Sequence, residues 1–558
     1  MAFQSIQNID ARHVLINNVG RDQYNIVYKF EGQFRLIAFI SNRSDLKSYT
    51  VREDVLKKLE PVKMDPSRRT ECLEGTRTDI LDFIINWVSD ATCPQNVLWV
   101  HGLAGSGKST ISTTVASHFR ESNQLGAFLF FNRDVTEHSD PTFVVRTLAW
   151  QLGSFHPQIG ELVSAVIERV TPIVLSPIPF QFQRLVVDPL SSALPLPETS
   201  HIVVVLDALD ECGTPEDRQT LVNVLAENLS RLPLTCRTII TSRADADIQD
   251  AFQSQPHILD KELDVTTVAT SHDISTYFRY QMTLIRTKKK YLGVDWPGES
   301  NIFDLTKRAC GLFVWASTAS KFIDGHDPRK RLDVILKGGG SAVSGAESAL
   351  DSLYQTALES VGLWNDDDFV ADYRAIIGMV LVLRNPLSST AIDVLLRTLD
   401  GRPSISTITN LGCVVTSNPT VRIIHPSFAD FLSTRSRCGR DIWFFQKTSC
   451  NSTLADHCLY HLNNVLRRNI CNMTLSVDRG NESLPEDIAY ACMFWIEHVC
   501  SIRENIPLIE EHLETFFNQH LLHWLEAMSI LRARDTTTQL YRLLDWINVS
   551  ASPFCIGT

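Results

Sequence analysis

The sequence has little of the features that mark nucleic-acid-binding and membrane proteins. Its longest basic block is Lys288-Lys289-Lys290, and its 558 residues carry a formal net charge of -12 at pH 7. No apolar run approaches the ~20 residues that span a bilayer. The first residues, Met1-Ala2-Phe3-Gln4-Ser5, have neither the positive region nor the apolar core of a secretion signal. We therefore expect a cytoplasmic protein with no nucleic-acid partner and no membrane span.

Cysteine pairs of the kind that bind zinc are missing too. The 13 cysteines include no C-x-x-C pair, and their number is odd. Reduced, mostly buried thiols are therefore expected, rather than a disulfide framework or a zinc site. His457, Cys458 and His461 lie close together in a helical stretch, but no partner pair accompanies them. We expect them at core or surface positions.

One short motif stands out in this otherwise ordinary composition. It follows the apolar run 97–100 and precedes a segment in which Ile111, Val115 and Phe119 recur at helical spacing. Strand, glycine-rich loop and helix are the context that the motif G-x-x-x-x-G-K-[ST] requires. The motif consists of Gly102, Leu103, Ala104, Gly105, Ser106, Gly107, Lys108, Ser109 and Thr110. The sequence therefore predicts a phosphate-binding loop, over the alternative of a glycine turn beside a solvated lysine.

Each residue type in this loop has a physical task. Gly102, Gly105 and Gly107 permit backbone angles that place successive N–H groups around one anion, and the following helix adds its positive end. Lys108 would reach the β- and γ-phosphates, and the Ser109 hydroxyl would bind Mg²⁺. No N-K-x-D guanine signature follows, which favours adenine. The implied cofactors are ATP or ADP with Mg²⁺.

Further apolar runs predict the sheet around this loop. Residues 127–131, 202–206 and 238–240 read as buried strands, and helical patterns separate them. Strands that alternate with helices predict a doubly wound parallel sheet, which binds its ligand at the carboxyl ends of the strands. The expected fold is therefore an α/β P-loop NTPase.

Polar residues follow two of these strands directly. Asp207 is placed to hold the magnesium of a bound nucleotide, and Asp210 and Glu211 could polarise an attacking water, with Glu211 the better candidate for a general base. The alternative is a helix N-cap with acidic first-turn residues. Arg243 follows the strand at 238–240 and could contact a γ-phosphate. Its alternative is a surface arginine in a loop.

Three motifs together resemble a known family. They are Gly-Leu-Ala-Gly-Ser-Gly-Lys-Ser-Thr at 102–110, Leu-Asp-Ala-Leu-Asp-Glu-Cys at 206–212 and Thr-Ser-Arg at 241–243. They look like the NACHT nucleotide-binding module of the STAND class of signal-transduction ATPases. The stretches 72–77, 131–134 and 311–316 are similar to fungal NACHT proteins whose first part is labelled the nephrocystin-3-like N-terminal domain. The similarity runs from about residue 70 almost to the end.

The resemblance implies further nucleotide contacts. Gly75, Thr76 and Arg77 correspond to the segment that closes over adenine and ribose, although a turn and an exposed helix start are equally compatible with these residues. His425 stands where related proteins carry a winged-helix histidine that touches the β-phosphate of ADP; a histidine satisfied at a strand end is its alternative. The lid lacks a clear G-x-P motif for adenine, since the nearest stretch is 311–313.

The sequence divides into five expected regions. Residues 1–70 contain short strands, around 14–20 and 25–28, and have no recognisable role; residues 71–260 form the NACHT domain. A helical lid at 261–340 ends in the linker Gly338-Gly339-Gly340-Ser341. A winged-helix domain at 341–440 includes a hairpin around 413–424, and 441–558 is a helical region without a fixed repeat, so a repeat sensor array is not expected.

The predicted function is an ATP/ADP-binding signalling switch with slow hydrolysis. ADP would hold a closed form, and ATP would favour an open form that self-associates. Protein partners would bind the helical C-terminal region or the N-terminus, and the family suggests fungal non-self recognition or cell death. The alternatives are a scaffold that binds nucleotide without turnover and a housekeeping NTPase or small-molecule kinase, which has no evident use for some 300 further residues.

Overall fold

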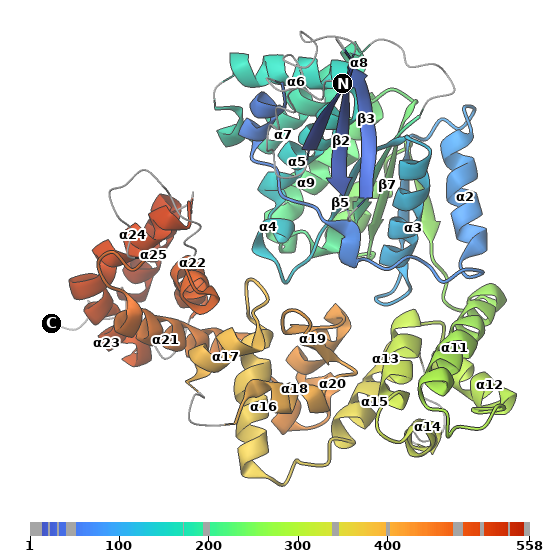
Figure 1. The fold of residues 1–558 in the computed structure, drawn as a ribbon, viewed down its shortest axis with the longest axis vertical. Helices are drawn as coiled ribbons and strands as arrows, with labels where there is room; N and C mark the ends of the chain where they lie inside the picture. Colours follow the sequence, from blue (N-terminus) through green and yellow to red (C-terminus); the bar gives the residue numbers. More distant parts are fainter. Residues whose placement is uncertain are drawn as a thin grey trace, which may run out of the picture. The chain divides into compact units, whose positions relative to one another are not determined.

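The computed structural model describes most of the chain as two compact units. The described residues are 14–20, 23–30, 33–40, 52–170, 172–193, 201–337, 345–397, 402–471, 484–502, 507–533 and 536–551. One unit is Met1–Asp264 and the other is Val265–Thr558. Helices and strands mix in the first unit, whereas helices dominate the second (Figure 1). No helix among the described residues is both long enough and apolar enough to cross a membrane.

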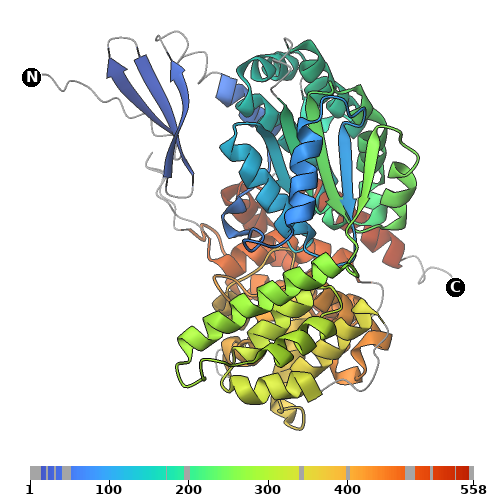
Figure 2. The same ribbon diagram turned by 90° about the vertical axis from the view of Figure 1, so that its right-hand side faces the viewer.

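The first unit begins with three antiparallel strands. They are β1 (Val14–Gly20), β2 (Gln23–Phe30) and β3 (Gln33–Ile40), paired in sequence order as a meander (Figure 2). The short strands expected in this region are therefore confirmed, and β3 adds a third that the pattern did not single out.

A five-stranded parallel sheet forms the centre of the first unit. Its strand order is β5-β6-β7-β4-β8, and each neighbouring pair is parallel. All five carboxyl ends therefore lie at one edge, and β7 separates the strand before the glycine-rich loop from the strand that ends in Asp207. The sequence did not predict β8. The strands are β4 (Val97–His101), β5 (Leu125–Phe130), β6 (Ile202–Asp207), β7 (Cys236–Ser242) and β8 (Ile258–Glu262).

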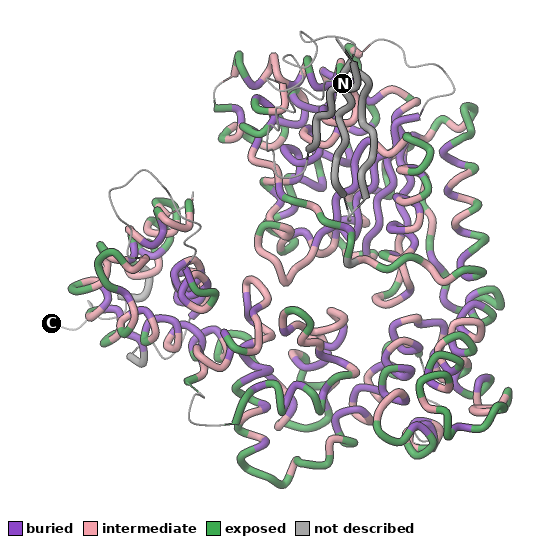
Figure 3. Tube along the Cα trace, in the orientation of Figure 1, coloured by how far each residue is buried: buried purple, intermediate pink, exposed green. Residues whose placement is uncertain are grey.

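Helices cover both faces of this sheet, so the doubly wound α/β prediction is confirmed. Leu98 and Val100 pack in one core with α2 and α3, whereas Val97 and Trp99 pack in a second core with α5, α9 and α10. This alternation follows from the period-two geometry of a strand. Figure 3 shows the strands buried between the helical layers. The helices are α2 (Thr78–Ser89), α3 (Lys108–Glu121), α4 (Thr136–Ser139), α5 (Val144–Phe155), α6 (Pro157–Arg169), α7 (Ile178–Phe182), α8 (Asp188–Ser192), α9 (Pro215–Asn228) and α10 (Ala246–Phe252).

Among its described residues, the regular structure of the second unit is helical apart from one short hairpin. β9 (Val415–Thr416) and β10 (Arg422–Ile423) pair antiparallel, where the sequence predicted a hairpin. A continuous hydrophobic core joins the described helices of this unit. They are α11 (Val268–Lys288), α12 (Glu299–Arg308), α13 (Phe313–Ile323), α14 (Pro328–Lys337), α15 (Ala346–Glu359), α16 (Asp367–Val380), α17 (Ser389–Leu396), α18 (Ser404–Asn410), α19 (Pro426–Ser433), α20 (Arg435–Cys438), α21 (Lys447–Val465), α22 (Glu486–Cys500), α23 (Pro507–Thr515), α24 (Leu521–Ile530) and α25 (Thr536–Ala551).

The finer domain boundaries stay predictions. The linker expected at 338–341 lies outside the described residues. The core of the second unit includes residues from Val265 to Leu543, so packing alone does not separate a lid, a winged helix and a C-terminal region. The helical character expected for residues 441–558 is found in the described part of that region.

Candidate functional site

The glycine-rich loop joins the carboxyl end of β4 to the first turn of α3. Gly105 and Gly107 have φ angles of 77° and 96°, a region that side chains with a Cβ rarely adopt. Gly102 serves differently: a Cβ there would lie 3.2 Å from the Leu263 backbone oxygen. The sequence assigned all three glycines to backbone freedom. In the structure Gly105 and Gly107 allow the loop to turn, and the missing side chain of Gly102 leaves room for Leu263, which follows β8.

Lys108 is buried where the loop ends and α3 begins. Its Nζ donates to the carbonyl oxygens of Gly102 at 2.8 Å and Leu103 at 2.9 Å. Burial lowers the pKa of Lys108, because it disfavours the charged ammonium; Asp210 opposes that effect, and Arg243 reinforces it. Asp207 and Glu211 also raise the pKa of Lys108. The motif lysine therefore lies within electrostatic reach of every catalytic or metal-binding residue that the sequence proposed after β6 and β7.

Asp207 ends β6 as a fully buried carboxylate. Its Oδ1 accepts hydrogen bonds from the Ser112 hydroxyl at 3.0 Å and the Thr241 hydroxyl at 2.5 Å. Its Oδ2 accepts from the Arg69 guanidinium. Ser109 stands exposed in the first turn of α3. A carboxylate and a hydroxyl are donors that suit Mg²⁺, which completes its shell with water and substrate phosphates.

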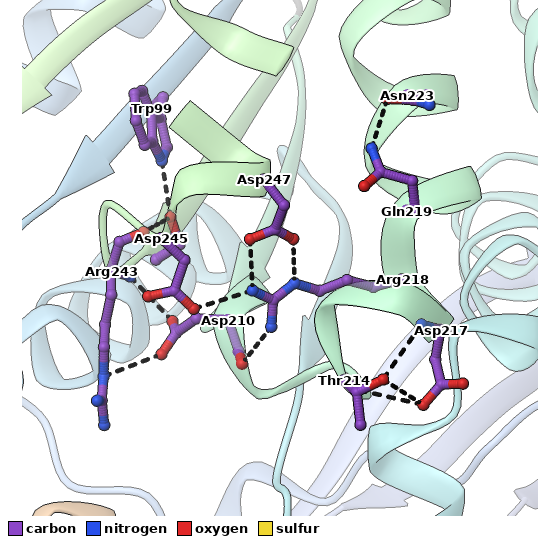
Figure 4. Close-up of polar contacts among 11 residues, drawn as sticks. Trp99, Asp210, Thr214, Asp217, Arg218, Gln219, Asn223, Arg243, Asp245 and Asp247 are labelled. Atoms are coloured by element: carbon purple, nitrogen blue, oxygen red, sulfur yellow. Dashed lines mark hydrogen bonds and ion pairs between the residues drawn. The ribbon is translucent and has the colours of Figure 1, made fainter. Parts of the chain in front are cut away.

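Asp210 and Arg243 form one hydrogen-bonded pair rather than two separate groups. Asp210 lies on η6 (Leu209–Glu211), the short helical turn after β6, and Arg243 follows β7. The Arg243 backbone N–H donates to Asp210 Oδ1 at 3.0 Å, and Arg243 Nε lies 3.2 Å from Asp210 Oδ2. Figure 4 shows the Arg243 side chain along this carboxylate. Asp210 therefore holds Arg243 in this structure, and the role in polarising water that the sequence suggested for Asp210 stays a prediction.

A buried arginine that the sequence did not single out holds this pair in place. Arg218, on α9, donates from Nε to Asp247 Oδ2 at 2.8 Å and from Nη2 to Asp247 Oδ1 at 2.9 Å. Nη2 also lies 2.9 Å from Asp245 Oδ2, and Nη1 donates to the Asp210 carbonyl at 2.8 Å. Figure 4 shows Arg218 between these groups. One guanidinium therefore ties the turn after β6 to the loop after β7.

Glu211 completes the acidic edge beside Asp210. Burial raises the pKa of Glu211 to about 7, since the charged carboxylate loses water; Arg133 opposes this, and the charges of Asp210 and Asp207 add to it. A carboxylate with a pKa near the working pH can take and return a proton. The general-base role that the sequence suggested for Glu211 stays a prediction, and a pKa of about 7 is compatible with it.

The segment Gly75-Thr76-Arg77 lies against the phosphate-binding loop. Arg77 Nη2 donates to the Ser106 carbonyl oxygen at 2.5 Å, and Arg77 is buried. Gly75 and Arg77 adopt φ angles of 79° and 58°, and the Thr76 hydroxyl donates to the Leu73 carbonyl at 2.6 Å. The structure therefore brings this segment to the loop. Its contact with adenine and ribose stays a prediction.

His425 belongs to the second unit, where it caps α19. Its Nδ1 accepts from the Ser427 backbone N–H at 3.2 Å, and the Ser427 hydroxyl lies 2.7 Å from the same nitrogen. The Tyr354 hydroxyl lies 2.8 Å from the Ser427 hydroxyl. With Nδ1 as an acceptor, Nε2 carries the proton of the neutral ring. A contact between His425 and a phosphate stays a prediction.

Arg218 and Arg69 were both missed from the sequence, but only Arg218 has a position in the sequence pattern that indicates a buried ion pair. Arg218 stands in the inward register of α9, three and four positions before the buried Leu221 and Val222. A charged residue at such a core position is a sign of a buried ion pair. Arg69 has no comparable signal, because its partner Asp207 is 138 positions away.

Comparisons with known proteins agree with the motifs. Residues 75–243 match the family model described as Nephrocystin 3, N-terminal. The chain is 22% identical to vegetative incompatibility protein HET-E-1 of Podospora anserina over an alignment of 493 residues, gaps included, and the match covers 81% of this chain and 34% of that protein. It therefore spans about a third of that relative's length. The expected resemblance to fungal proteins with this domain is confirmed.

Two solved structures illustrate what the chain resembles in fold. The first is a STAND protein with a tetratricopeptide repeat sensor from Pyrococcus horikoshii, with TM-score 0.43 and 14% identity, over 88% of this chain and 56% of that one. The second is Cdc6p from Pyrobaculum aerophilum, with TM-score 0.28 and 13% identity, over 72% of this chain and 97% of that one.

Proposed function

Because the chain carries a nephrocystin 3 N-terminal domain and is related to HET-E-1, we propose that it is an ATP- and ADP-binding signalling switch. One observation carries the proposal. Lys108 begins α3, whose Ser112 hydroxyl donates to Asp207 at the end of β6 at 3.0 Å, and Asp210 on the following turn lies 3.2 Å from Arg243 after β7. The two carboxylates and the arginine come from two further strand ends, and together with Lys108 they supply the groups that nucleotide binding and hydrolysis need.

Each group has a role in the proposed chemistry. Lys108 and the loop amides would bind the β- and γ-phosphates, and Ser109 and Asp207 would hold Mg²⁺, whose charge would offset that of the phosphates. Glu211 takes the proton of the attacking water, since its pKa of about 7 suits that exchange. Arg243, held by Asp210, contacts the γ-phosphate. Loss of this phosphate would remove a charge-assisted contact and so distinguish ATP from ADP.

The switch rests on a difference in affinity between two forms of the chain. A nucleotide shifts a closed-to-open equilibrium only by as much as it binds one form better than the other. In the proposal His425 donates from Nε2 to the β-phosphate of ADP and favours the closed form. ATP favours an open form that self-associates. The name of HET-E-1 suggests vegetative incompatibility as the setting, and the helical C-terminal region is the proposed surface for protein partners.

The deciding experiment identifies the nucleotide that the protein carries through purification. The protein is denatured, and the released nucleotide is separated and quantified for the native chain, for Lys108→Ala and for Lys337→Ala. Lys337 is the matched control, because its side chain is exposed and far from the loop in sequence. We expect one ADP per chain in the native protein and the control, and none in Lys108→Ala. An empty native protein that also fails to bind added ATP would contradict the proposal and favour a nucleotide-independent scaffold.

A further inference from the structure

Arg69 forms an ion pair with Asp207, and the proposed chemistry gives this arginine no role. Its guanidinium pairs with Asp207 Oδ2, and its Nε donates to the Thr113 hydroxyl at 3.3 Å. The guanidinium carbon lies 4.8 Å from the centre of the Phe130 ring and 5.9 Å from that of Phe128. A carboxylate, a hydroxyl and two aromatic rings therefore define one position for this side chain.

A cation that approaches Asp207 meets a carboxylate whose two oxygens both already accept hydrogen bonds. The other carboxylate oxygen, Oδ1, already accepts from Ser112 and Thr241, and the residue is fully buried. Oδ2 is the oxygen that Arg69 holds. A guanidinium and a divalent cation are both attracted to this buried carboxylate, and their like charges repel each other at such short range. Arg69 and Mg²⁺ therefore cannot both bind Oδ2 closely.

We propose that Arg69 competes with Mg²⁺ for Asp207 and so sets the concentration of Mg²⁺ that the bound nucleotide requires. The inference rests on the proposed nucleotide-binding function, and it adds a residue that acts on the metal rather than on the phosphates. Arg69 neutralises the Asp207 carboxylate when no metal is bound, and the metal binds Oδ2 only after the guanidinium has moved away from it.

The segment that carries Arg69 links this competition to the nucleotide. The Cys72 backbone N–H donates to the Thr114 hydroxyl at 2.8 Å, and the Ser117 hydroxyl lies 2.5 Å from the Glu71 carboxylate. Residues 69–72 therefore lie along α3, and residues 75–77 follow directly at the loop. A shift of this segment on nucleotide binding would move Arg69 relative to Asp207.

The test measures metal binding directly. Mn²⁺ replaces Mg²⁺ as the probe, and the electron paramagnetic resonance signal of free Mn²⁺ is titrated with the full-length ADP complex. Arg69→Gln is compared with Arg146→Gln. Arg146 is a matched control: its side chain is 8% exposed against 19% for Arg69, it stacks 4.3 Å from the centre of the Phe143 ring, and it is paired with Glu60. Charge-assisted hydrogen bonds are worth enough to change a binding constant by about tenfold or more.

We expect Arg69→Gln to lower the Kd for Mn²⁺ by about tenfold or more, and Arg146→Gln to leave it unchanged. A second variant, Arg69→Lys, keeps the charge but loses the planar guanidinium that contacts Asp207 and Thr113 at the same time. The Kd for Mn²⁺ should therefore fall less in Arg69→Lys than in Arg69→Gln. Arg69→Lys also retains a counter-ion for the buried carboxylate if Arg69→Gln folds poorly. A Kd that is unchanged or higher in both Arg69 variants would overturn the competition. A native chain that carries and binds no nucleotide would instead overturn the proposed function along with it.

Discussion

Replacement of Arg218 tests how the turn after β6 and the loop after β7 are held together. Arg218→Ala removes four hydrogen bonds, of 2.8, 2.9, 2.9 and 2.8 Å, to Asp247, Asp245 and the Asp210 carbonyl. The Arg218 side chain is 2% exposed and that of Asp247 is 10% exposed, so the variant leaves a buried carboxylate without its partner. Breaking such a pair costs about 3–5 kcal/mol of unfolding free energy. For a unit of this size, that is a fall of about 10 °C in the melting temperature.

The assay is differential scanning calorimetry with and without ADP, because the transition that ADP raises belongs to the nucleotide-binding unit. Arg184→Ala is the control. Its partner Asp188 lies one helical turn away, and the two side chains are 51% and 38% exposed, so the loss should stay under about 1 kcal/mol. If Arg218→Ala lowers this transition no more than Arg184→Ala, the buried pair does not stabilise the site. A second readout is ATP hydrolysis, which should fall in Arg218→Ala because the turn that carries Asp210, the partner of Arg243, loses its bond to Arg218.

Two further predictions concern proton transfer and the second unit. Glu211 acts as a base only when ionised, so the hydrolysis rate at saturating ATP should rise between pH 6 and pH 8 with an apparent pKa of about 7. Glu211→Gln should lower that rate about a hundredfold, whereas a flat pH profile would remove Glu211 from the chemistry. His425→Ala should speed ADP release and increase self-association, as measured by stopped-flow fluorescence and light scattering. Ser427→Ala, which removes a hydroxyl 2.7 Å from His425 Nδ1, should have the same effect more weakly, and ADP release that is unchanged in both variants would exclude the histidine.

The sequence predicted the parts of the site that are contiguous in the chain. Strand, loop and helix around Lys108 follow one another directly, and their local pattern indicates both the structure and the chemistry. Asp207 could be placed for a similar reason, because a polar residue after a buried parallel strand falls at the binding edge. The position of Gly75 and Arg77 at the loop came from the family resemblance, since nothing in their spacing indicates it.

The pairing between side chains could not be predicted in the same way. Asp210 and Arg243 were proposed as separate catalytic groups, because no sequence pattern shows that β7 lies beside β6 and brings them together. Arg69 reaches Asp207 across 138 positions, and such a contact depends on the completed fold. The strand β8 was missed for another reason. Only its first two residues are apolar, and charged residues such as Lys261 follow them. Edge strands often carry charged residues, so the sequence offers no buried apolar run at this point.

The place of β7 in the sheet determines when the site can exist as the chain is synthesised. β4 and β6 are never direct neighbours, so the strand pairing between the loop and Asp207 is incomplete until residues 236–242 have been synthesised and inserted between them. A nascent chain that ends at Asp207 would contain the whole phosphate-binding motif and its carboxylate, but not the strand that lies between them in the sheet. Pairing between strands as distant as Val97 and Thr238 closes a long loop and is slow. The loop is thus among the first parts of the site to be made, whereas Leu263, whose backbone oxygen would lie 3.2 Å from a Cβ at Gly102, is made only after all five strands.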